Sequence, residues 1–145
     1  MTIATSPFGT LFDSVLDSLT GALNIQSARE KVSTISGATG TVVHNVANGN
    51  IFLHSSLVSD FTANFTNLNL SSLYGTSLVL VLQQGVTAYM PTLTSIGGSL
   101  VSVVWVGGAV PSGNSNKIDV VSFSIINTST GVPSYLVLGQ LTTFG

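Results

Sequence analysis

The spacing of hydrophobic and polar residues changes along the chain near residue 34. Over residues 6–24 the apolar residues recur every three or four positions, which is typical of one face of a helix. Ser6 is a favourable N-cap residue, and Pro7 suits the first position of a helix. The sequence therefore predicts one helix over residues 6–24. A connector that carries three of the eight charged residues follows it.

After residue 34 apolar and polar residues alternate, as expected of β-strands with one buried face. Stretches rich in glycine, asparagine and proline separate these segments. Eight strands are predicted, over Thr41–Val46, Asn50–Ser55, Thr62–Leu70, Thr76–Gln83, Thr87–Met90, Leu100–Val106, Lys117–Ile126 and Ser134–Leu141. The pattern favours an all-β, antiparallel sandwich or jelly-roll-like domain over residues 34–145, behind a short N-terminal helix and connector over residues 1–33.

The pair Asn48-Gly49 is the strongest local turn signal. Both residue types tolerate a positive φ, so the pair predicts a two-residue hairpin between the first two predicted strands. In that register His44 and His54 lie on opposite faces of the hairpin, because side chains alternate along a strand. We therefore expect His44 to be partly buried and hydrogen-bonded, and we expect no metal site formed by the two histidines.

Charged residues make up only 6% of the chain, whereas 44% of the residues are hydrophobic. After Val32 only Asp60, Lys117 and Asp119 carry a charge. Because charge keeps folded monomers apart in solution, a surface this neutral predicts coverage by copies of the chain or by other proteins. We predict a homo-oligomer, specifically a trimer. No basic cluster is present, which argues against nucleic acid as a partner.

The apolar segments do not have the properties of targeting or membrane-spanning sequences. The N-terminal segment has no Lys or Arg ahead of its apolar residues, unlike a signal peptide. The longest apolar runs, over residues 78–82 and 100–110, are shorter than the roughly 20 residues of a spanning helix. We expect no membrane insertion.

Few residues have the chemistry that catalysis requires. Cysteine is absent, and His44 and His54 are the only histidines. The sequence has no nucleophile elbow, phosphate-binding loop or zinc-protease motif. Lys117 and Asp119 share a face of a predicted strand and are interpreted as a solvated ion pair, with an intersubunit contact as the alternative. We predict a non-enzymatic protein without a cofactor or a bound metal.

The apolar face of the predicted N-terminal helix is the candidate oligomerisation or attachment site. It consists of Phe8, Leu11, Phe12, Val15, Leu16, Leu19 and Leu23. Such a stripe can pack on the chain's own β domain, which is its usual role. It can also join several chains in a short coiled coil, or dock on a different protein. The sequence leaves these alternatives open.

Seven short segments follow residue 24 in a fairly specific order and spacing. They are Ala28–Glu30, Ala38–Val42, Phe61–Phe65, Gln84–Tyr89, Trp105–Gly108, Pro111–Asn114 and Ile118–Val120. In this arrangement residues 24–145 resemble a module of virion structural and tail-fibre-like proteins of marine cyanophages and related phages. The resemblance implies localisation in the virion, other virion proteins as partners, and no catalytic residues.

The function that the resemblance implies is that of a non-enzymatic bacteriophage virion structural protein. It would be tail- or fibre-associated and would build or decorate the particle surface. The alternatives are a capsid decoration (cement) protein and a carbohydrate-binding receptor-recognition module. The latter would bind a host-surface glycan through aromatic residues such as Tyr74, Tyr89 or Trp105. In the family the module ends a longer protein, whereas here only the predicted helix precedes it, so its position in head, tail or fibre stays open.

Overall fold

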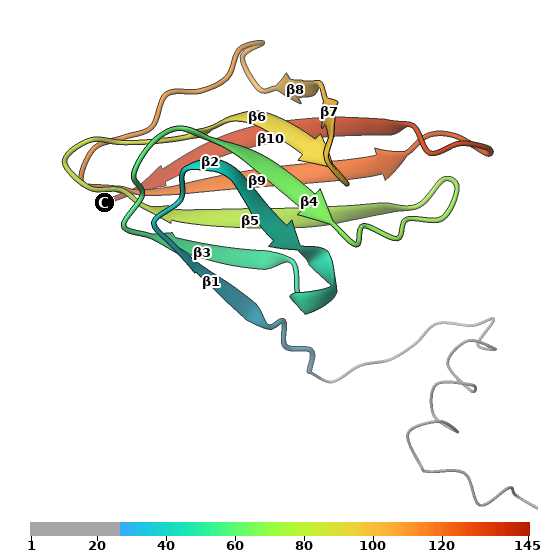
Figure 1. Cartoon of the computed structure of the whole chain (residues 1–145), viewed down its shortest axis with the longest axis horizontal. Coiled ribbons are helices and arrows are strands. Elements are labelled where there is room, and N and C mark those ends of the chain that lie inside the picture. Colours follow the sequence, from blue (N-terminus) through green and yellow to red (C-terminus); the bar gives the residue numbers. More distant parts are fainter. Residues whose placement is uncertain (1–26) are drawn as a thin grey trace, which may run out of the picture.

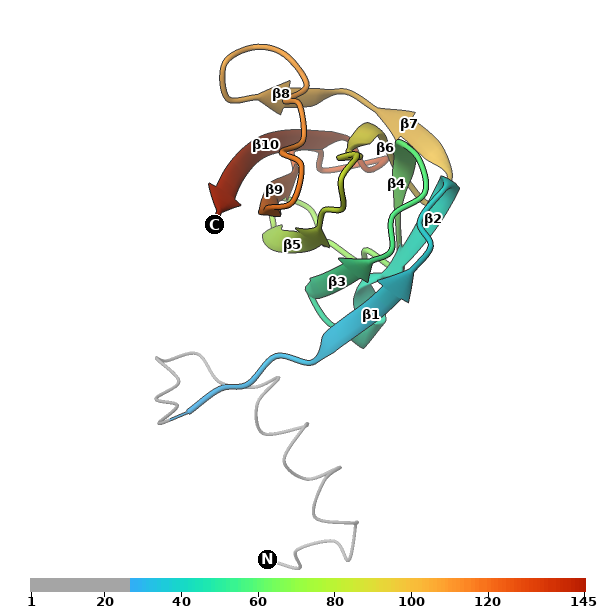
Figure 2. The same cartoon turned by 90° about the vertical axis from the view of Figure 1, so that its left-hand side faces the viewer.

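The computed structural model describes residues 27–145, which form two packed β-sheets (Figure 1; Figure 2). The six-stranded sheet contains, in spatial order, β1 (Val32–Ser36), β3 (Ile51–Ser55), β5 (Gly75–Gln83), β9 (Ile118–Asn127), β10 (Tyr135–Phe144) and β8 (Val103–Trp105). The four-stranded sheet contains β2 (Gly40–Asn45), β4 (Phe61–Thr66), β6 (Pro91–Ile96) and β7 (Ser99–Val101). The predicted all-β class is thus confirmed. The predicted helix and its apolar stripe lie outside the described residues.

Both sheets are mixed, so the predicted antiparallel arrangement is wrong. The first six strands alternate between the sheets, and strands β1, β3 and β5 are parallel neighbours in one sheet. Strands β2, β4 and β6 are parallel neighbours in the other sheet. A parallel neighbour requires the chain to return to the same end of the sheet. Here the strand in the opposite sheet provides that return, which makes the first half of the domain a flattened coil.

The C-terminal half of the domain adds antiparallel pairs to this coil. Strand β9 lies between β5 and β10 and pairs antiparallel with both. Strand β7 pairs antiparallel with β6, whereas β8 pairs parallel with β10. The long strands β5, β9 and β10 therefore form the centre of the six-stranded sheet. Within residues 27–145 no helix has the length and hydrophobicity needed to cross a membrane.

The predicted hairpin at Asn48-Gly49 is also wrong. Residues Val46–Asn48 form a short 3-10 helix, capped by the Asn45 side chain, which accepts a hydrogen bond from the Ala47 backbone N–H. This turn carries the chain from β2 in one sheet to β3 in the other. Gly49 has a φ of 125°, and a Cβ atom there would collide with the Lys31 carbonyl oxygen. Glycine is therefore required by the close approach of the chain ahead of β1, and not by a hairpin turn.

Two strand assignments from the sequence differ from the structure for local reasons. Residues 87–90, predicted as a strand, belong to a loop that Gln84 holds by accepting from the Tyr89 N–H and donating to the Tyr89 carbonyl. The strand that follows, β6, begins at Pro91, a position where a strand tolerates the missing N–H. Strand β1 begins at Val32, within the segment that the sequence assigned to the connector.

The core lies between the sheets and follows the alternation of the long strands. On β5 the inward residues are leucines, and on β9 the inward residues Val121, Phe123 and Ile125 alternate with exposed ones. Burying each large apolar side chain stabilises the fold by about 1.5–3 kcal/mol. The buried apolar residues are Ala38, Val42, Phe52, Phe61, Ala63, Phe65, Leu68, Leu78, Leu80, Leu82, Met90, Trp105, Val121, Phe123, Ile125 and Val137.

Candidate functional site

The outer face of the six-stranded sheet carries no charged residue. Its side chains are aliphatic, aromatic, hydroxyl or amide groups, and they alternate with the core residues along each strand. We refer to this surface as the neutral face. It comprises Val32, Thr34, Ile51, Leu53, Ser77, Val79, Val81, Gln83, Val104, Ile118, Val120, Ser122, Ser124, Ile126, Leu136, Leu138, Gln140, Thr142 and Phe144.

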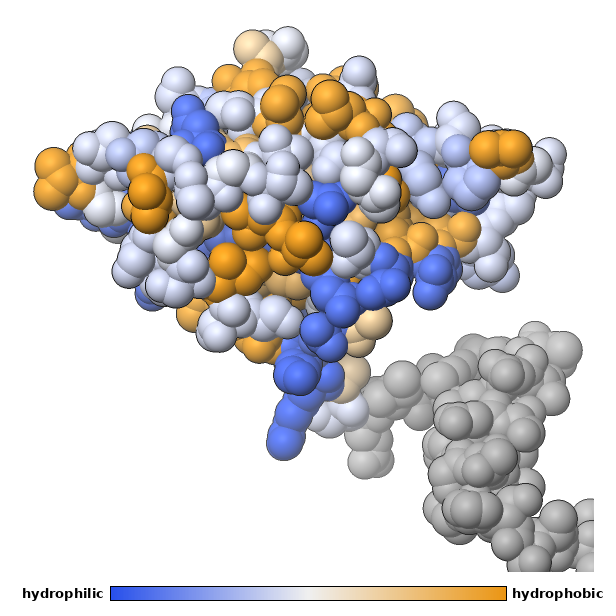
Figure 3. All heavy atoms as spheres, in the orientation of Figure 1, coloured by the Kyte–Doolittle hydropathy of each residue, from blue (hydrophilic) through white to orange (hydrophobic). Residues whose placement is uncertain are grey.

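The charged residues of the described chain lie elsewhere. Arg29, Glu30 and Lys31 precede β1, Asp60 lies in the loop before β4, and Lys117 lies just before β9. Asp119 is fully buried. In Figure 3 the largest hydrophilic group lies beside the first described residues, whereas the rest of the visible surface mixes hydrophobic and weakly polar residues. The sandwich thus exposes very little charge.

The neutral face is large enough to act as an interface. Strands β5, β9 and β10 contain nine or ten residues each. They make a strip about 30 Å long and about 15 Å wide at ordinary strand spacing. Between β8, β9 and β10 the face is hollowed by a cavity of about 360 Å³ lined by Ser122, Ser124 and Leu138 among others. The exposed hydrophobic residues of the neutral face include Val104, Ile118, Leu136, Leu138 and Phe144. Large exposed apolar patches mark interaction sites.

Asp119 is a buried carboxylate and forms no ion pair with Lys117, so the predicted solvated pair is wrong. Its side chain points into the sandwich, where it accepts hydrogen bonds from Gln84 Nε2 (3.1 Å), the Asn114 backbone N–H (2.8 Å), Asn114 Nδ2 (3.0 Å) and Thr143 Oγ1 (2.8 Å). Lys117 instead donates from Nζ to a backbone oxygen of Gly145. Asp119 therefore joins the loops at one end of the sandwich.

The two histidines meet in the core, contrary to the predicted hairpin register. His44 projects inward from β2 and His54 from β3, so they face each other from opposite sheets. Their Nε2 atoms are 2.9 Å apart, and both residues are 0% exposed. Phe52, Phe61 and Phe65 pack around them, with ring centroids 5.0–6.3 Å from that of His44. A hydrogen bond between imidazoles thus links the two sheets.

This pair is neutral near pH 7. Burial, with the nearby His54 as a second cause, lowers the pKa of His44 from 6.5 to about 3. Burial likewise lowers the pKa of His54 from 6.5 to about 4. One imidazole donates from Nε2 and the other accepts there, which leaves both Nδ1 atoms without a partner among residues 27–145.

The geometry of the histidine pair does not match a metal centre. Metal-bound histidines usually donate the other ring N–H to an oriented partner, and here both Nδ1 atoms are unpaired within the described chain. No cluster of three or more His, Cys, Asp or Glu side chains occurs in residues 27–145. A structural zinc site needs four ligands. We therefore interpret the pair as a core contact.

The aromatic residues considered for glycan binding do not gather on one surface. Tyr74 immediately precedes β5 and is exposed, whereas Tyr89 contacts Gln84 just beyond the other end of β5. These positions are about 30 Å apart along the strand. Trp105 on β8 is buried at 8% exposure and lines both the hollow on the neutral face and a second pocket near β6 and β7.

Comparison with known proteins finds no relative of this chain. No protein-family model matches the sequence, and neither a curated protein nor a solved structure matches the chain.

Proposed function

We propose that this chain is a non-enzymatic structural protein of a bacteriophage virion. It is tail- or fibre-associated and builds or decorates the particle surface. The observation that carries the proposal is the neutral face, because an uncharged sheet surface is suited to permanent coverage by protein. The sequence resemblance of residues 24–145 to a virion module supplies the biological setting. The comparisons with known proteins give no information about this setting.

The partner that covers the neutral face is a second copy of this chain. Ser122, Ser124 and Leu138 surround a hollow, while aliphatic and aromatic side chains such as Ile126 and Phe144 stand exposed elsewhere on the same face. A neutral surface has no charge to repel another copy, and in a closed ring of three the neutral face of one copy meets a different surface of the next copy. We infer a homotrimer, to which the stripe of Phe8, Leu11, Phe12, Val15, Leu16, Leu19 and Leu23 contributes as a second contact or as an anchor on another virion protein.

A charge placed on the neutral face tests this assembly. Leu138→Lys changes a side chain that is 40% exposed, so the monomer should lose less than about 0.5 kcal/mol of stability. Val43→Lys, on the outer face of the four-stranded sheet and 56% exposed, is the matched control. Light scattering should give a trimer for the wild type and for Val43→Lys, and a monomer for Leu138→Lys. A wild-type monomer at micromolar concentration would refute self-assembly.

The location in the particle requires a separate experiment. Mass spectrometry of purified virions of the phage that encodes this chain should detect its peptides in structural amounts. Antibody labelling in the electron microscope should then place the label on the tail or fibre. Labelling spread over the head would instead support the capsid-decoration alternative, and absence from purified virions would contradict the proposal.

A further inference from the structure

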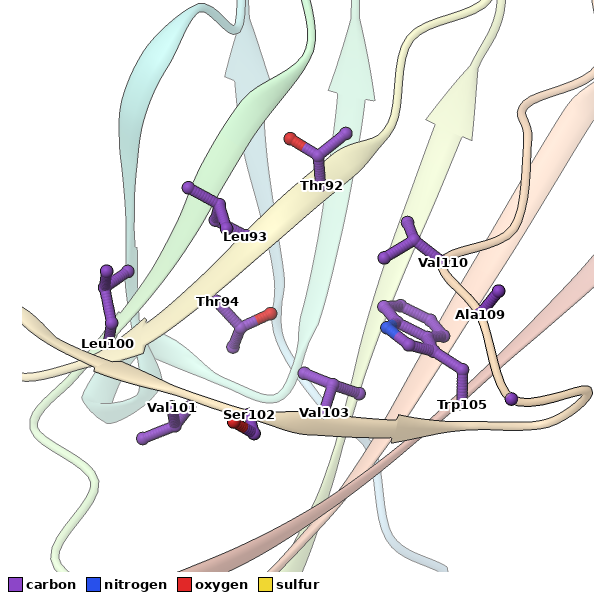
Figure 4. A pocket seen from close by; sticks show the side chains of 11 residues that line it. Thr92, Leu93, Thr94, Leu100, Val101, Ser102, Val103, Trp105, Ala109 and Val110 are labelled. Carbon is purple, nitrogen blue, oxygen red and sulfur yellow. The ribbon is translucent and has the colours of Figure 1, made fainter.

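A pocket lies where the chain crosses from the four-stranded to the six-stranded sheet. The sequence predicts one continuous strand over Leu100–Val106, but the structure breaks it at Ser102, between β7 and β8. This crossing leaves a cavity of about 540 Å³ beneath the 106–110 loop (Figure 4). Its walls are Thr92, Leu93, Thr94, Leu100, Val101, Ser102, Val103, Trp105, Gly108, Ala109 and Val110. The volume lies within the range of small-molecule sites.

Two polar groups converge on this pocket. The Thr94 hydroxyl is buried and has no hydrogen-bond partner among the described residues, although Thr94 is only 3% exposed. In Figure 4 this hydroxyl and the nitrogen-bearing edge of the Trp105 indole point toward each other across the pocket. An unpaired buried hydroxyl destabilises the folded protein. A ligand hydroxyl between these two groups would remove that destabilisation.

Trp105 is held in a fixed position for this role. Its ring meets Phe123 edge to face, with centroids 5.6 Å apart. A Cβ atom at position 139 would lie only 2.6 Å from the indole, so Gly139 allows the ring to rest directly on β10. Trp105 is only 8% exposed, and in Figure 4 the nitrogen-bearing edge of its indole lies on the side of the pocket.

The chemistry of the walls defines the ligand. No wall residue is charged, so the pocket has no means of compensating a charged ligand. Hydroxyl groups of Thr92, Thr94 and Ser102 occur together with the aliphatic side chains of Val101 and Val103. A sugar ring combines hydroxyl groups with apolar C–H faces in this way. We propose that the pocket binds a neutral sugar unit, with one sugar hydroxyl between the Thr94 hydroxyl and the Trp105 indole N–H.

The pocket can be tested directly because Trp105 is the only tryptophan in the chain. The full-length protein is titrated with glucose, galactose, mannose, N-acetylglucosamine, maltose and lactose while the tryptophan fluorescence is recorded. At least one neutral sugar should shift the emission with a Kd of about 0.1–10 mM. Glucuronate and glucosamine, the charged counterparts, should bind at least tenfold more weakly. No response to any of the neutral sugars at tens of millimolar would overturn the proposal.

Thr94→Val separates binding from folding. The substitution keeps the shape and removes the unpaired hydroxyl, so the melting temperature should stay equal or rise. Affinity for the sugar should fall at least tenfold. Thr41→Val, on an exposed position of β2 outside the pocket, is the control and should bind as the wild type. Unchanged affinity in Thr94→Val would overturn the proposed site. This outcome is independent of virion assembly, which the Leu138→Lys experiment tests.

Discussion

Asp119 and the His44–His54 pair are both fully buried polar sites, but they are satisfied to very different degrees. The Asp119 carboxylate accepts four hydrogen bonds from three residues. The two imidazoles share one hydrogen bond, and their Nδ1 atoms have no partner in the described chain. A buried carboxylate is tolerated only when hydrogen-bond donors pair with its oxygen atoms, whereas a neutral imidazole can be buried with fewer hydrogen bonds.

The difference follows from the surroundings of each site. Asp119 lies near the start of β9, where Gln84 and Asn114 come from loops whose backbone and side chains can adapt to it. The histidines lie in strands, where the neighbouring backbone groups already pair with adjacent strands. The aromatic rings around them offer no hydrogen-bond acceptor of comparable strength. Loops can therefore satisfy a buried charge fully, and the centre of the sandwich tolerates polar groups only while they stay neutral.

Removing the Asp119 carboxylate should have the largest effect on the stability of the folded protein. Asp119→Ala removes all four hydrogen bonds and leaves the Asn114 backbone N–H and one N–H of Gln84 Nε2 without an acceptor, so we expect the free energy of unfolding to fall by about 5 kcal/mol. Urea denaturation monitored by Trp105 fluorescence measures it. Ser122→Ala, on the exposed face of the same strand, is the control and should change stability by less than about 0.5 kcal/mol. A loss below about 1 kcal/mol for Asp119→Ala would show that the hydrogen bonds around it contribute little.

Acidification should produce the next largest effect, through the histidine pair. The folded pKa values of about 3 and about 4 lie below the ordinary 6.5, so the unfolded chain binds protons first as the pH falls. The contribution of the neutral pair to the free energy of unfolding is fully present above about pH 6.5, and it declines as the pH falls from there toward 4. Lowering the pH from 7 to 5 should therefore reduce the free energy of unfolding by about 2 kcal/mol for each imidazole, or by about 4 kcal/mol for the pair. Urea unfolding at several pH values measures this decline.

Substitutions at the pair identify the source of that acid sensitivity. His54→Leu leaves the His44 Nε2 atom unpaired and should cost about 2 kcal/mol at pH 7. The double variant His44→Leu/His54→Leu removes both polar partners, so its stability at pH 7 should lie within about 1 kcal/mol of the wild type. Its stability should also vary less between pH 7 and pH 5 than that of the wild type. An unchanged pH dependence in the double variant would place the sensitivity elsewhere.

The sequence alone determined the features that depend on local pattern. Alternation located β5 and β9 within one residue at each end. The scarcity of charged residues after Val32 likewise predicted a neutral surface. These features follow from the period of a strand and from composition, neither of which depends on which strands become neighbours.

The tertiary structure alone decided which strands pair and which polar groups meet. Asn48-Gly49 suits a hairpin, but the turn crosses between sheets because β2 and β3 find parallel partners far along the chain. That choice brings His44 to His54. In the same way, the break at Ser102 creates the Trp105 pocket, and packing of distant loops encloses Asp119. Alternation fixes which side of a strand is buried, whereas long-range pairing fixes what that side contacts.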